Sequence, residues 1–497
     1  MLEREMKFEV PEHFLLPDLS RIATVVAPAG PCHLHAAYFD TDDLDLLACG
    51  ITLRRRVEPG RAGWTLKLPA GEAGGALCRH EVEAQGTISE VPASLSLAVA
   101  AAARGRPLTL RAEVATERTE YLLRDPSGRC IAALDDDLVA ARTVDGRDLR
   151  LRELELELRE AATQGLAEAI AQALGAAGAT RSAPRPKLAR ILGRDPSPAA
   201  EPAALPRGAS ARSVLGTAIA RAVREVVTCD PVIRLDLDAE AVHDARVAMR
   251  RVRAQLGVFG GHFDPAWRTV LRGELAWHGE GLGRLRDADV QLRRLDAWAG
   301  RLRGSSGAGV DRLREILASE RAAAREDLLE QMGTPRYVAL LDALRAAAAD
   351  PPLREGAASG PAGLARDVLR AWHRLGRAVA ELPRRPSPPD LHTVRIGVKR
   401  VRYAAEALVP LARRDGGAWL RALRDVQQSL GDVQDAVMAA RWLRAAAAAH
   451  PEVAQAAASL QAAGRSEARR ALRDWEGAWR RASAKGGRRW LKDLGGR

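Results

Sequence analysis

The chain has 497 residues, more than a single hydrophobic core usually serves, so we expect at least two domains. Its formal charge of +12 at pH 7 predicts binding of polyanions, but charge alone does not separate nucleic acid, an anionic membrane and polyphosphate. Five scattered cysteines, a charged N-terminus and no long apolar run disfavour disulfides, a signal peptide and a membrane span, so we expect a cytoplasmic protein.

Up to about residue 160, short alternating segments broken by turn residues predict antiparallel strands, for example at residues 50–57 and 63–68. Side chains two residues apart on a strand share a face, so charged residues gather on one face of several segments. These sets are Glu3, Glu5 and Lys7; Arg54 and Arg56; Arg79, Glu81 and Glu83; and Glu153, Glu155 and Glu157. A solvated sheet face would explain any one segment taken alone.

The mixture of charges favours a binding site instead. An acidic triplet at Glu153, Glu155 and Glu157 repels itself unless cations lie among its members. Mg²⁺ and Mn²⁺ prefer carboxylate oxygens, whereas arginine and lysine match phosphate oxygens. A closed barrel lined by both kinds of side chain could therefore hold a metal-triphosphate complex.

This half resembles the CYTH family, also called triphosphate tunnel metalloenzymes. Glu3-x-Glu5-x-Lys7 matches the family's ExExK signature, and further pieces follow in family order. They are Tyr38-Phe39-Asp40-Thr41, the Leu-Arg-x-Arg strand from Leu53 to Arg56, Lys67, Arg79-x-Glu81-x-Glu83, Arg118, Asp135, the Glu153 to Glu157 strand and Lys187. The match covers about residues 1–192 and implies an eight-stranded antiparallel β-barrel whose tunnel binds triphosphate and Mg²⁺ or Mn²⁺.

The resemblance also implies roles for single residues. The catalytic set would be Glu3, Glu5 and Lys7. The substrate-binding set would be Lys7, Arg54, Arg56, Lys67, Arg118 and Lys187. The metal-binding set would be Glu3, Glu5, Glu155 and Glu157. The implied reaction is metal-assisted hydrolysis without a serine, cysteine or histidine nucleophile. The chain departs from the family at Pro186-Lys187, where Ser-Lys is common.

A proline-rich segment at residues 195–206 predicts a linker between a first domain at 1–194 and a second at 207–490. The second domain consists of Ala/Leu/Arg-rich helical stretches and contains an internal repeat, around 207–345 and 360–490. The segment from His243 to Arg253 recurs from His392 to Arg402, 149 residues later. A second motif, Leu282 to Asp287, recurs from Leu430 to Asp435 at an offset of 148, so we infer a duplication.

On a helix, the repeated segment places basic residues on one face and apolar residues on another. The two basic stripes are His243, Arg246, Arg250 and Arg253, and His392, Arg395, Lys399 and Arg402. Interhelical pairing with Asp287, Asp289 and Asp435 would explain one stripe as a packing face. The duplication of the stripe favours a groove that binds a polyanion.

The repeat resembles the CHAD domain, from about residue 210 to about residue 480. The resemblance implies an all-helical domain of two pseudo-symmetric four-helix bundles, whose basic groove binds inorganic polyphosphate through the eight residues of the stripes. The whole chain is thus expected to be a multidomain α+β protein. Association with polyphosphate granules would follow from such a groove.

These patterns together predict an inorganic triphosphatase-type phosphohydrolase that acts on inorganic triphosphate or a related short phosphate chain, joined to a polyphosphate-binding domain. One alternative is a CYTH enzyme that acts on an organic triphosphate, such as an adenylate cyclase or thiamine triphosphatase. Another is a non-catalytic polyphosphate-binding or granule-associated protein. Specific nucleic-acid binding is disfavoured because base stacking needs aromatic residues, which make up only 4% of the chain.

Overall fold

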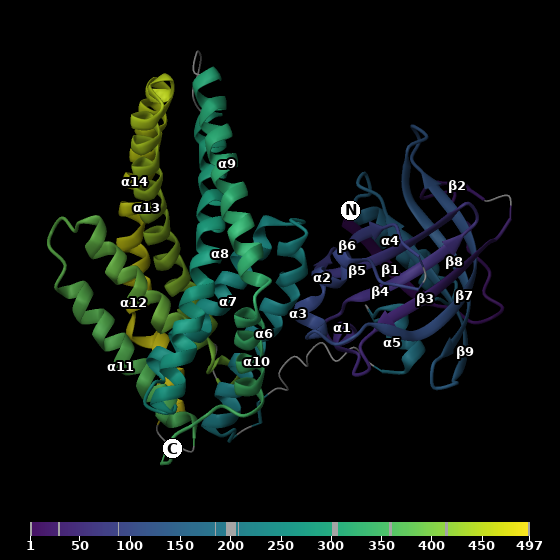
Figure 1. Cartoon of the computed structure of the whole chain (residues 1–497), viewed down its shortest axis with the longest axis horizontal. Helices are drawn as coiled ribbons and strands as arrows, with labels where there is room; N and C mark the ends of the chain where they lie inside the picture. The colour runs from purple at the N-terminus through teal and green to yellow at the C-terminus, as the bar shows by residue number, and fades with distance from the viewer. Residues whose placement is uncertain are drawn as a thin grey trace. The chain divides into compact units, whose positions relative to one another are not determined.

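The computed structural model describes residues 2–27, 30–87, 89–183, 185–194, 205–206, 208–300, 307–356, 360–412 and 416–495. The chain forms two compact units, an N-terminal β unit and a C-terminal helical unit, which are described separately (Figure 1). Of the expected linker at 195–206, all residues except Leu205 and Pro206 lie outside the described part of the chain.

The β unit is a closed antiparallel barrel, as expected. Its eight long strands are β1 (Leu2–Glu9), β3 (Cys32–Asp40), β4 (Thr52–Glu58), β5 (Arg61–Ala73), β6 (Ala76–Ala84), β7 (Thr109–Arg124), β8 (Cys130–Thr143) and β9 (Asp148–Leu158). They pair in the order β1-β6-β5-β4-β3-β7-β8-β9, and β9 pairs with β1 to close the ring. Two short strands, β2 (Thr24–Val26) and β10 (Thr180–Arg181), pair with β7 and β1.

In the described part of the first 194 residues, five helices accompany the barrel: α1 (Asp45–Ala48), α2 (Ala93–Ala98), α3 (Ala100–Ala103), α4 (Gln164–Ala176) and α5 (Lys187–Leu192). The period-two pattern of β9 explains the packing around α4, because Leu154 and Leu156 point outward into a core that includes Ile170 of this helix. Helix α5 begins directly after Pro186, and its Leu188 packs with residues of β7 and β8. This packing carries the first residue of α5, Lys187, to the barrel.

The helical unit repeats one order of helices twice. The first half contains α6 (Ala211–Arg234), α7 (Ala239–Val258), α8 (Pro265–Ala299), α9 (Gly307–Met332) and α10 (Pro335–Ala349). The second half contains α11 (Pro361–Ala380), α12 (Pro388–Glu406), α13 (Gly417–Ala449), α14 (Ala454–Ser483) and α15 (Arg489–Gly495). Within the described residues, each half thus has four long helices, as the resemblance implied, followed by a shorter fifth.

The two basic stripes lie on equivalent helices, α7 and α12, which pack against each other. The opposite face of each helix is buried as predicted, for example at Val242 and Met249 of α7 and at Val394 and Val398 of α12. Ser387 caps the N-terminus of α12 through a capping box. Burial of the apolar faces fixes the rotation of both helices and leaves the basic side chains on the remaining surface.

Two long helical hairpins, α8 with α9 and α13 with α14, extend from the rest of this unit (Figure 1). Their outer ends share one apolar cluster, in which Trp298 and Leu313 of the first hairpin lie with Leu443 and Leu460 of the second. No helix within the described ranges is both long enough and apolar enough to cross a membrane.

Candidate functional site

A cavity of about 510 Å³ inside the barrel collects every residue for which the CYTH resemblance implied a role. They come from five strands and one helix: Glu3, Glu5 and Lys7 from β1, Arg54 and Arg56 from β4, Lys67 from β5, Arg118 from β7, Glu155 and Glu157 from β9, and Lys187 from α5. The inward faces predicted from period-two alternation are therefore brought together around one space.

Strand register sets the contacts between β1 and β9. Glu5 lies opposite Glu157, and Lys7 lies opposite Glu155. The Lys7 Nζ atom donates a 2.6 Å hydrogen bond to Glu155 Oε1. Burial alone would lower the pKa of Lys7, but the nearby carboxylates, Glu155 first among them, raise this pKa above its ordinary value. Lys7 is therefore a buried, protonated ammonium.

Glu155 contacts three cations of the site. Besides Lys7, it contacts Arg118 Nη2 at 3.0 Å and Lys187 Nζ at 3.5 Å. Burial would raise the pKa of Glu155, but the charges of Lys187, Lys7 and Arg118 hold it well below its usual range. An ionised Glu155 thus positions three of the cations that the resemblance assigned to phosphate.

Two acids that were not assigned a role lie beside Glu155. Oxygen atoms of Asp137, Glu153 and Glu155 lie within 4.8 Å of one another, a geometry that could hold a metal ion. Cations already occupy this cluster, because Lys187 Nζ lies 2.7 Å from Asp137 Oδ2 and 2.9 Å from Glu153 Oε1. Arg118 also donates two 2.7 Å hydrogen bonds to Asp137. We interpret the cluster as the anchor of these two cations.

Of the other acidic lining residues, Glu3 is paired, whereas Glu5 and Glu157 are less well compensated than Glu155. Both oxygens of Glu3 accept hydrogen bonds of 2.7 Å from Lys67 Nζ. The pKa of Glu157 is raised, first by burial and then by the charges of Glu3 and Glu81, although Arg159 and Lys67 oppose the shift. Glu5 is 4% exposed, and its Oε1 atom has no hydrogen-bond partner in the described part of the chain.

Arginines on β4 complete the basic lining. Arg54 Nη1 donates a 3.4 Å hydrogen bond to the Tyr38 hydroxyl, and its Nε atom is buried without a partner among the described residues. Arg56 Nε lies 3.6 Å from Glu58. Arg79, matched to the family without a role, donates to the carbonyls of Gly50 and Lys67 and therefore supports the wall of the cavity.

Asp135 is another residue of the site for which the sequence indicated no role. It is 3% exposed and lines the cavity, where it forms an ion pair with Arg118. Burial raises the pKa of Asp135 to about 7, and the neighbouring Asp137 and Glu155 add to this shift against the opposing charge of Arg118. The signal was present in the sequence, because Asp135 and Asp137 are two apart on a strand.

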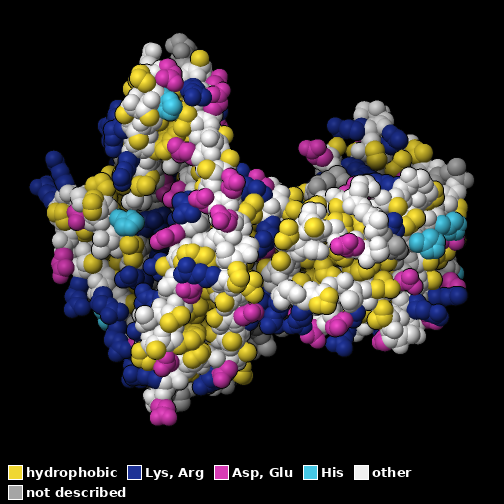
Figure 2. Space-filling model, in the orientation of Figure 1, with side chains coloured by type: hydrophobic (Ala, Val, Ile, Leu, Met, Phe, Trp, Pro, Cys, Tyr) yellow, Lys and Arg dark blue, Asp and Glu magenta, His cyan; other side chains and the backbone are white. Residues whose placement is uncertain are grey.

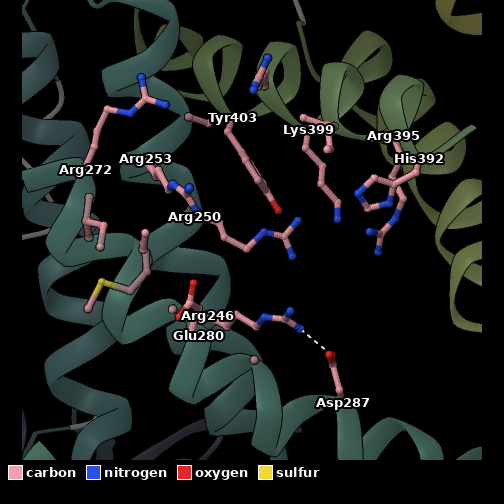
Figure 3. Close-up of a pocket in the computed structure, with 18 of the residues that line it drawn as sticks. Arg246, Arg250, Arg253, Arg272, Glu280, Asp287, His392, Arg395, Lys399 and Tyr403 are labelled. Carbon is pink, nitrogen blue, oxygen red and sulfur yellow. Dashed lines mark hydrogen bonds and ion pairs between the residues drawn. The ribbon is translucent and has the colours of Figure 1, made fainter. Parts of the chain in front are cut away.

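The helical unit contains a larger cavity, called the groove below, of about 670 Å³ between α7, α8 and α12. Six of the eight stripe residues line it: Arg246, Arg250, Arg253, His392, Arg395 and Lys399. Figure 3 shows Arg246 and Arg250 from one side, and His392, Arg395 and Lys399 from the other, pointing into the same space. Lys and Arg side chains also gather in the hollow on this face of the helical unit (Figure 2).

Two stripe residues do not line this groove. His243 is exposed on α7, outside the lining. Arg402 is 5% exposed and contacts Gln427 at 3.0 Å and Glu406 at 2.5 Å, and its guanidinium lies 4.5 Å from the centre of the Tyr403 ring. The Arg402 side chain is thus buried and packed against its neighbours.

The acidic residues proposed as packing partners account for little of the basic charge. Asp287 pairs with Arg246 at 3.1 Å, but Asp289 pairs with Arg321 and Asp435 with Arg294. Among the stripe residues that line the groove, the guanidinium groups of Arg250, Arg253 and Arg395 and the amine of Lys399 have no ion pair with any described residue. The stripes are therefore not salt-bridged packing faces over most of their length.

The pKa of Lys399 reflects the arginines that surround it. Burial first, and then the charges of Arg250, Arg395 and Arg246, lower the pKa of Lys399 to about 5, whereas Asp435 opposes the shift. The Lys399 side chain is 8% exposed, so water screens these repulsions poorly. An anion in the groove would relieve the repulsion.

Known protein families match both halves of the chain. The CYTH domain matches residues 1–192, and the CHAD domain matches residues 217–444. The chain belongs to the CYTH-CHAD family. A curated relative, the uncharacterized protein Rv2226 of Mycobacterium tuberculosis, is 32% identical over 479 residues, which cover 89% of this chain and 88% of the relative.

Two solved structures resemble parts of this CYTH-CHAD protein. PptA from Streptomyces chartreusis is 27% identical with a TM-score of 0.46, and the match covers 54% of this chain and 98% of PptA. The CHAD domain from the plant Ricinus communis is 24% identical with a TM-score of 0.45, over 58% of this chain and 94% of that domain. The family match supports a triphosphate-related, hydrolase-type and metal-dependent activity in the barrel, and CHAD domains are associated with polyphosphate.

Proposed function

We propose that the barrel hydrolyses inorganic triphosphate or a related short phosphate chain with the help of Mg²⁺ or Mn²⁺, and that the groove of the helical unit binds polyphosphate. The observation that supports the first part most strongly is the lining of the barrel cavity, where cations and carboxylates from seven strands and helix α5 face one space. Such a lining matches both components of a metal-triphosphate complex.

The Glu5 carboxylate oxygen without a hydrogen-bond partner among the described residues, and the carboxylates of Glu3 and Glu81 close enough to act on Glu157, are suited to a hard cation. We expect Glu3, Glu5, Glu155 and Glu157 to surround this cation, with Glu155 also holding Lys7, Arg118 and Lys187. A bound Mg²⁺ or Mn²⁺ would neutralise phosphate charge and activate the attacking water.

The basic residues would bind and orient the phosphate chain. Lys7 and Lys187 remain protonated because neighbouring carboxylates raise the pKa of each above its ordinary value, against the effect of burial. Arg54 and Arg56 face the cavity with fewer internal partners and are free to donate to phosphate oxygens. Charge stabilisation by prearranged donors is the main contribution that a protein makes to phosphoryl transfer.

Inorganic triphosphate fits this cavity better than a nucleotide or thiamine triphosphate. Among the described lining residues, Tyr38 supplies the only aromatic ring, and Arg54 already donates to its hydroxyl. An organic triphosphate would need an apolar or aromatic surface for its ring system. The described lining residues other than Tyr38 are charged, except for Gly30, Cys32, Leu34 and Thr52.

The unpaired cations of the groove support polyphosphate binding in the helical unit. A long inorganic chain offers dense negative charge and no bases. This matches a described lining in which Arg250, Arg253 and Arg395 have no ion pair and Tyr403 is the single Phe, Tyr or Trp. Association with polyphosphate granules in a cytoplasmic setting would follow from this binding.

Phosphate release by the full-length protein tests the barrel assignment. Inorganic triphosphate, ATP, thiamine triphosphate and long-chain polyphosphate would be compared with Mg²⁺, with Mn²⁺ and with EDTA. We expect the fastest release from inorganic triphosphate and complete loss in EDTA. Faster release from ATP or thiamine triphosphate would favour the organic alternative, and no metal-dependent release from any substrate would favour a binding protein.

A further inference from the structure

A second basic cavity, of about 510 Å³, lies in the helical unit where the end of α7, the start of α8 and the first turns of α11 meet the segment before α11. Five arginines line it: Arg268, Arg354, Arg366, Arg370 and Arg374. Asp367 is the single acidic residue among its described lining residues. Neither the repeat motifs nor the proposed function accounts for this cluster.

Backbone contacts hold the cavity in shape. A β-bridge joins Phe263 to Leu353, and next to it the backbone N–H of Arg354 donates a 3.0 Å hydrogen bond to the carbonyl of His262. Arg268 Nη1 donates a 2.8 Å hydrogen bond to the carbonyl of Gly260, and a Cβ atom at Gly260 would collide with the Arg268 guanidinium. Two of the arginines are therefore attached to fixed backbone.

The one carboxylate does not neutralise the cluster. Asp367 accepts a 2.8 Å hydrogen bond from His262 Nε2 and forms an ion pair with Arg370. Arg354, Arg366 and Arg374 have no ion pair with a described residue, so at least three positive charges remain uncompensated.

The N-terminus of α11 adds to the positive potential. Its N-cap is Gly360, which has no side chain to bond the free N–H groups of the first turn. Gly363, in that turn, lines the cavity. Helix N-termini attract anions through these N–H groups and the helix dipole, so the arginines and the helix favour the same kind of ligand, a phosphate oxygen.

Arg272 connects this cavity to the groove. It lines the groove, while Arg268 lines the second cavity, and the two are one turn apart on α8, a rise of about 6 Å. Gly257 lines the second cavity, and a Cβ atom there would lie 3.7 Å from Arg272 Nη1. Burial and then the charges of Arg253, Arg268 and Arg400 lower the pKa of Arg272. In Figure 3, Arg272 lies on the side of the groove away from His392.

We propose that the groove and this second cavity form one continuous binding track, along which a single long inorganic phosphate chain extends past Arg272 to the arginines of α11. This inference rests on the proposed binding of polyphosphate by the groove. An inorganic chain is favoured over nucleic acid because the described lining of the second cavity contains no Phe, Tyr or Trp on which a base could stack.

The test compares two lengths of labelled polyphosphate on the full chain, one short enough for the groove alone and one long enough for both cavities. The cavity variant is Arg366→Ala with Arg374→Ala, both exposed on α11. Its control removes two exposed arginines elsewhere in the helical unit, Arg444→Ala with Arg470→Ala. Affinity is measured at several salt concentrations, and the same long-chain measurement is made with single-stranded DNA.

We expect the cavity variant to lose about tenfold in affinity for the long chain relative to its control, with a shallower salt dependence, and to bind the short chain as the control does. Equal binding of the long chain by cavity and control variants would overturn the inference, and so would an equal loss for both lengths. If DNA binds as tightly and loses as much, the ligand class is wrong.

A groove variant, Arg250→Ala with Arg253→Ala, separates this inference from the proposed function. We expect it to weaken binding of both lengths. If the groove variant binds both lengths like wild type, polyphosphate binding by the groove is wrong. If the groove variant loses both lengths while the cavity variant loses neither, the groove assignment stands and the extended track is wrong.

Discussion

Binding of polyphosphate in the groove should be coupled to proton uptake by Lys399. In the free protein this lysine is neutral at physiological pH, because burial and its neighbours lower its pKa to about 5. The charged groups that lower or raise it are Arg246 and Arg250 on α7, Arg395 on α12 and Asp435 on α13. Phosphates bound among the arginines would offset their repulsion and restore the proton to Lys399.

The size of the effect follows from the pKa. At pH 8, three units above the pKa, about one free molecule in a thousand carries a proton on Lys399. If bound phosphates return the pKa toward its ordinary value of 10.5, nearly every complex carries it. Binding then takes up about one proton, and affinity falls by up to about tenfold for each unit rise in pH.

Calorimetry at pH 8 in buffers of different ionisation enthalpy counts the protons taken up on binding. We expect wild type to take up about one proton more than Lys399→Met, which has a similar length and no titratable group. His243 and His392 are present in both proteins, so their protonation cancels in the difference. Equal proton uptake by the two proteins would refute this account of the groove.

Three further predictions concern single residues. Glu5→Gln and Glu157→Gln should each abolish metal-dependent triphosphate hydrolysis and leave the circular dichroism spectrum unchanged. The control Glu72→Gln, outside the cavity, should stay active. Undiminished turnover in the first two variants would contradict the metal assignment. Arg402→Ala should lower the free energy of urea unfolding by about 2–4 kcal/mol, because it breaks the buried pair of Arg402 with Glu406. The affinity for polyphosphate should stay within about twofold of wild type. Unchanged stability with a large loss of affinity would place Arg402 in the binding surface. Lys399→Met should raise the free energy of unfolding of the ligand-free protein, and the gain over wild type should grow as pH falls from 9 to 6. Because the folded state lowers the pKa of Lys399, the unfolded wild-type chain binds more protons, and wild type loses up to about 1.4 kcal/mol of stability per pH unit. A stability difference that does not change with pH would contradict this prediction.

Strand periodicity was sufficient to predict the lining of the barrel but not its internal pairing. Alternation placed Lys7 and Glu155 on inward faces, and the structure confirms that both line the cavity. The pairing of these two residues depends on the register between β1 and β9, which are far apart in the sequence. The contact of Lys187 with Asp137 and Glu153 depends further on the docking of α5, which a single sequence does not specify.

Helical periodicity had a similar limit. Residues at i, i+3, i+7 and i+10 do not form a straight line, because ten residues turn the last one about 80° away from the first. On α7, Arg253 still reaches the groove, whereas the equivalent Arg402 of α12 is covered by Gln427 from α13. The second cavity gave no sequence signal, because its arginines come from three segments and only those on α11 have helical spacing.

The two proposed sites differ in how their positive charge is balanced before phosphate binds. In the barrel, carboxylates hold the cations: Glu155 keeps Lys7 protonated, and a phosphate chain must exchange internal ion pairs for new ones. A metal-bound, compact chain is best able to do so, because it supplies cation and anion together. In the groove, Arg250 and Lys399 lack such partners, so added negative charge is favourable in itself. The affinity of the groove should therefore rise as the phosphate chain lengthens, as the salt concentration falls and as Lys399 is protonated. Turnover in the barrel should depend on the metal instead.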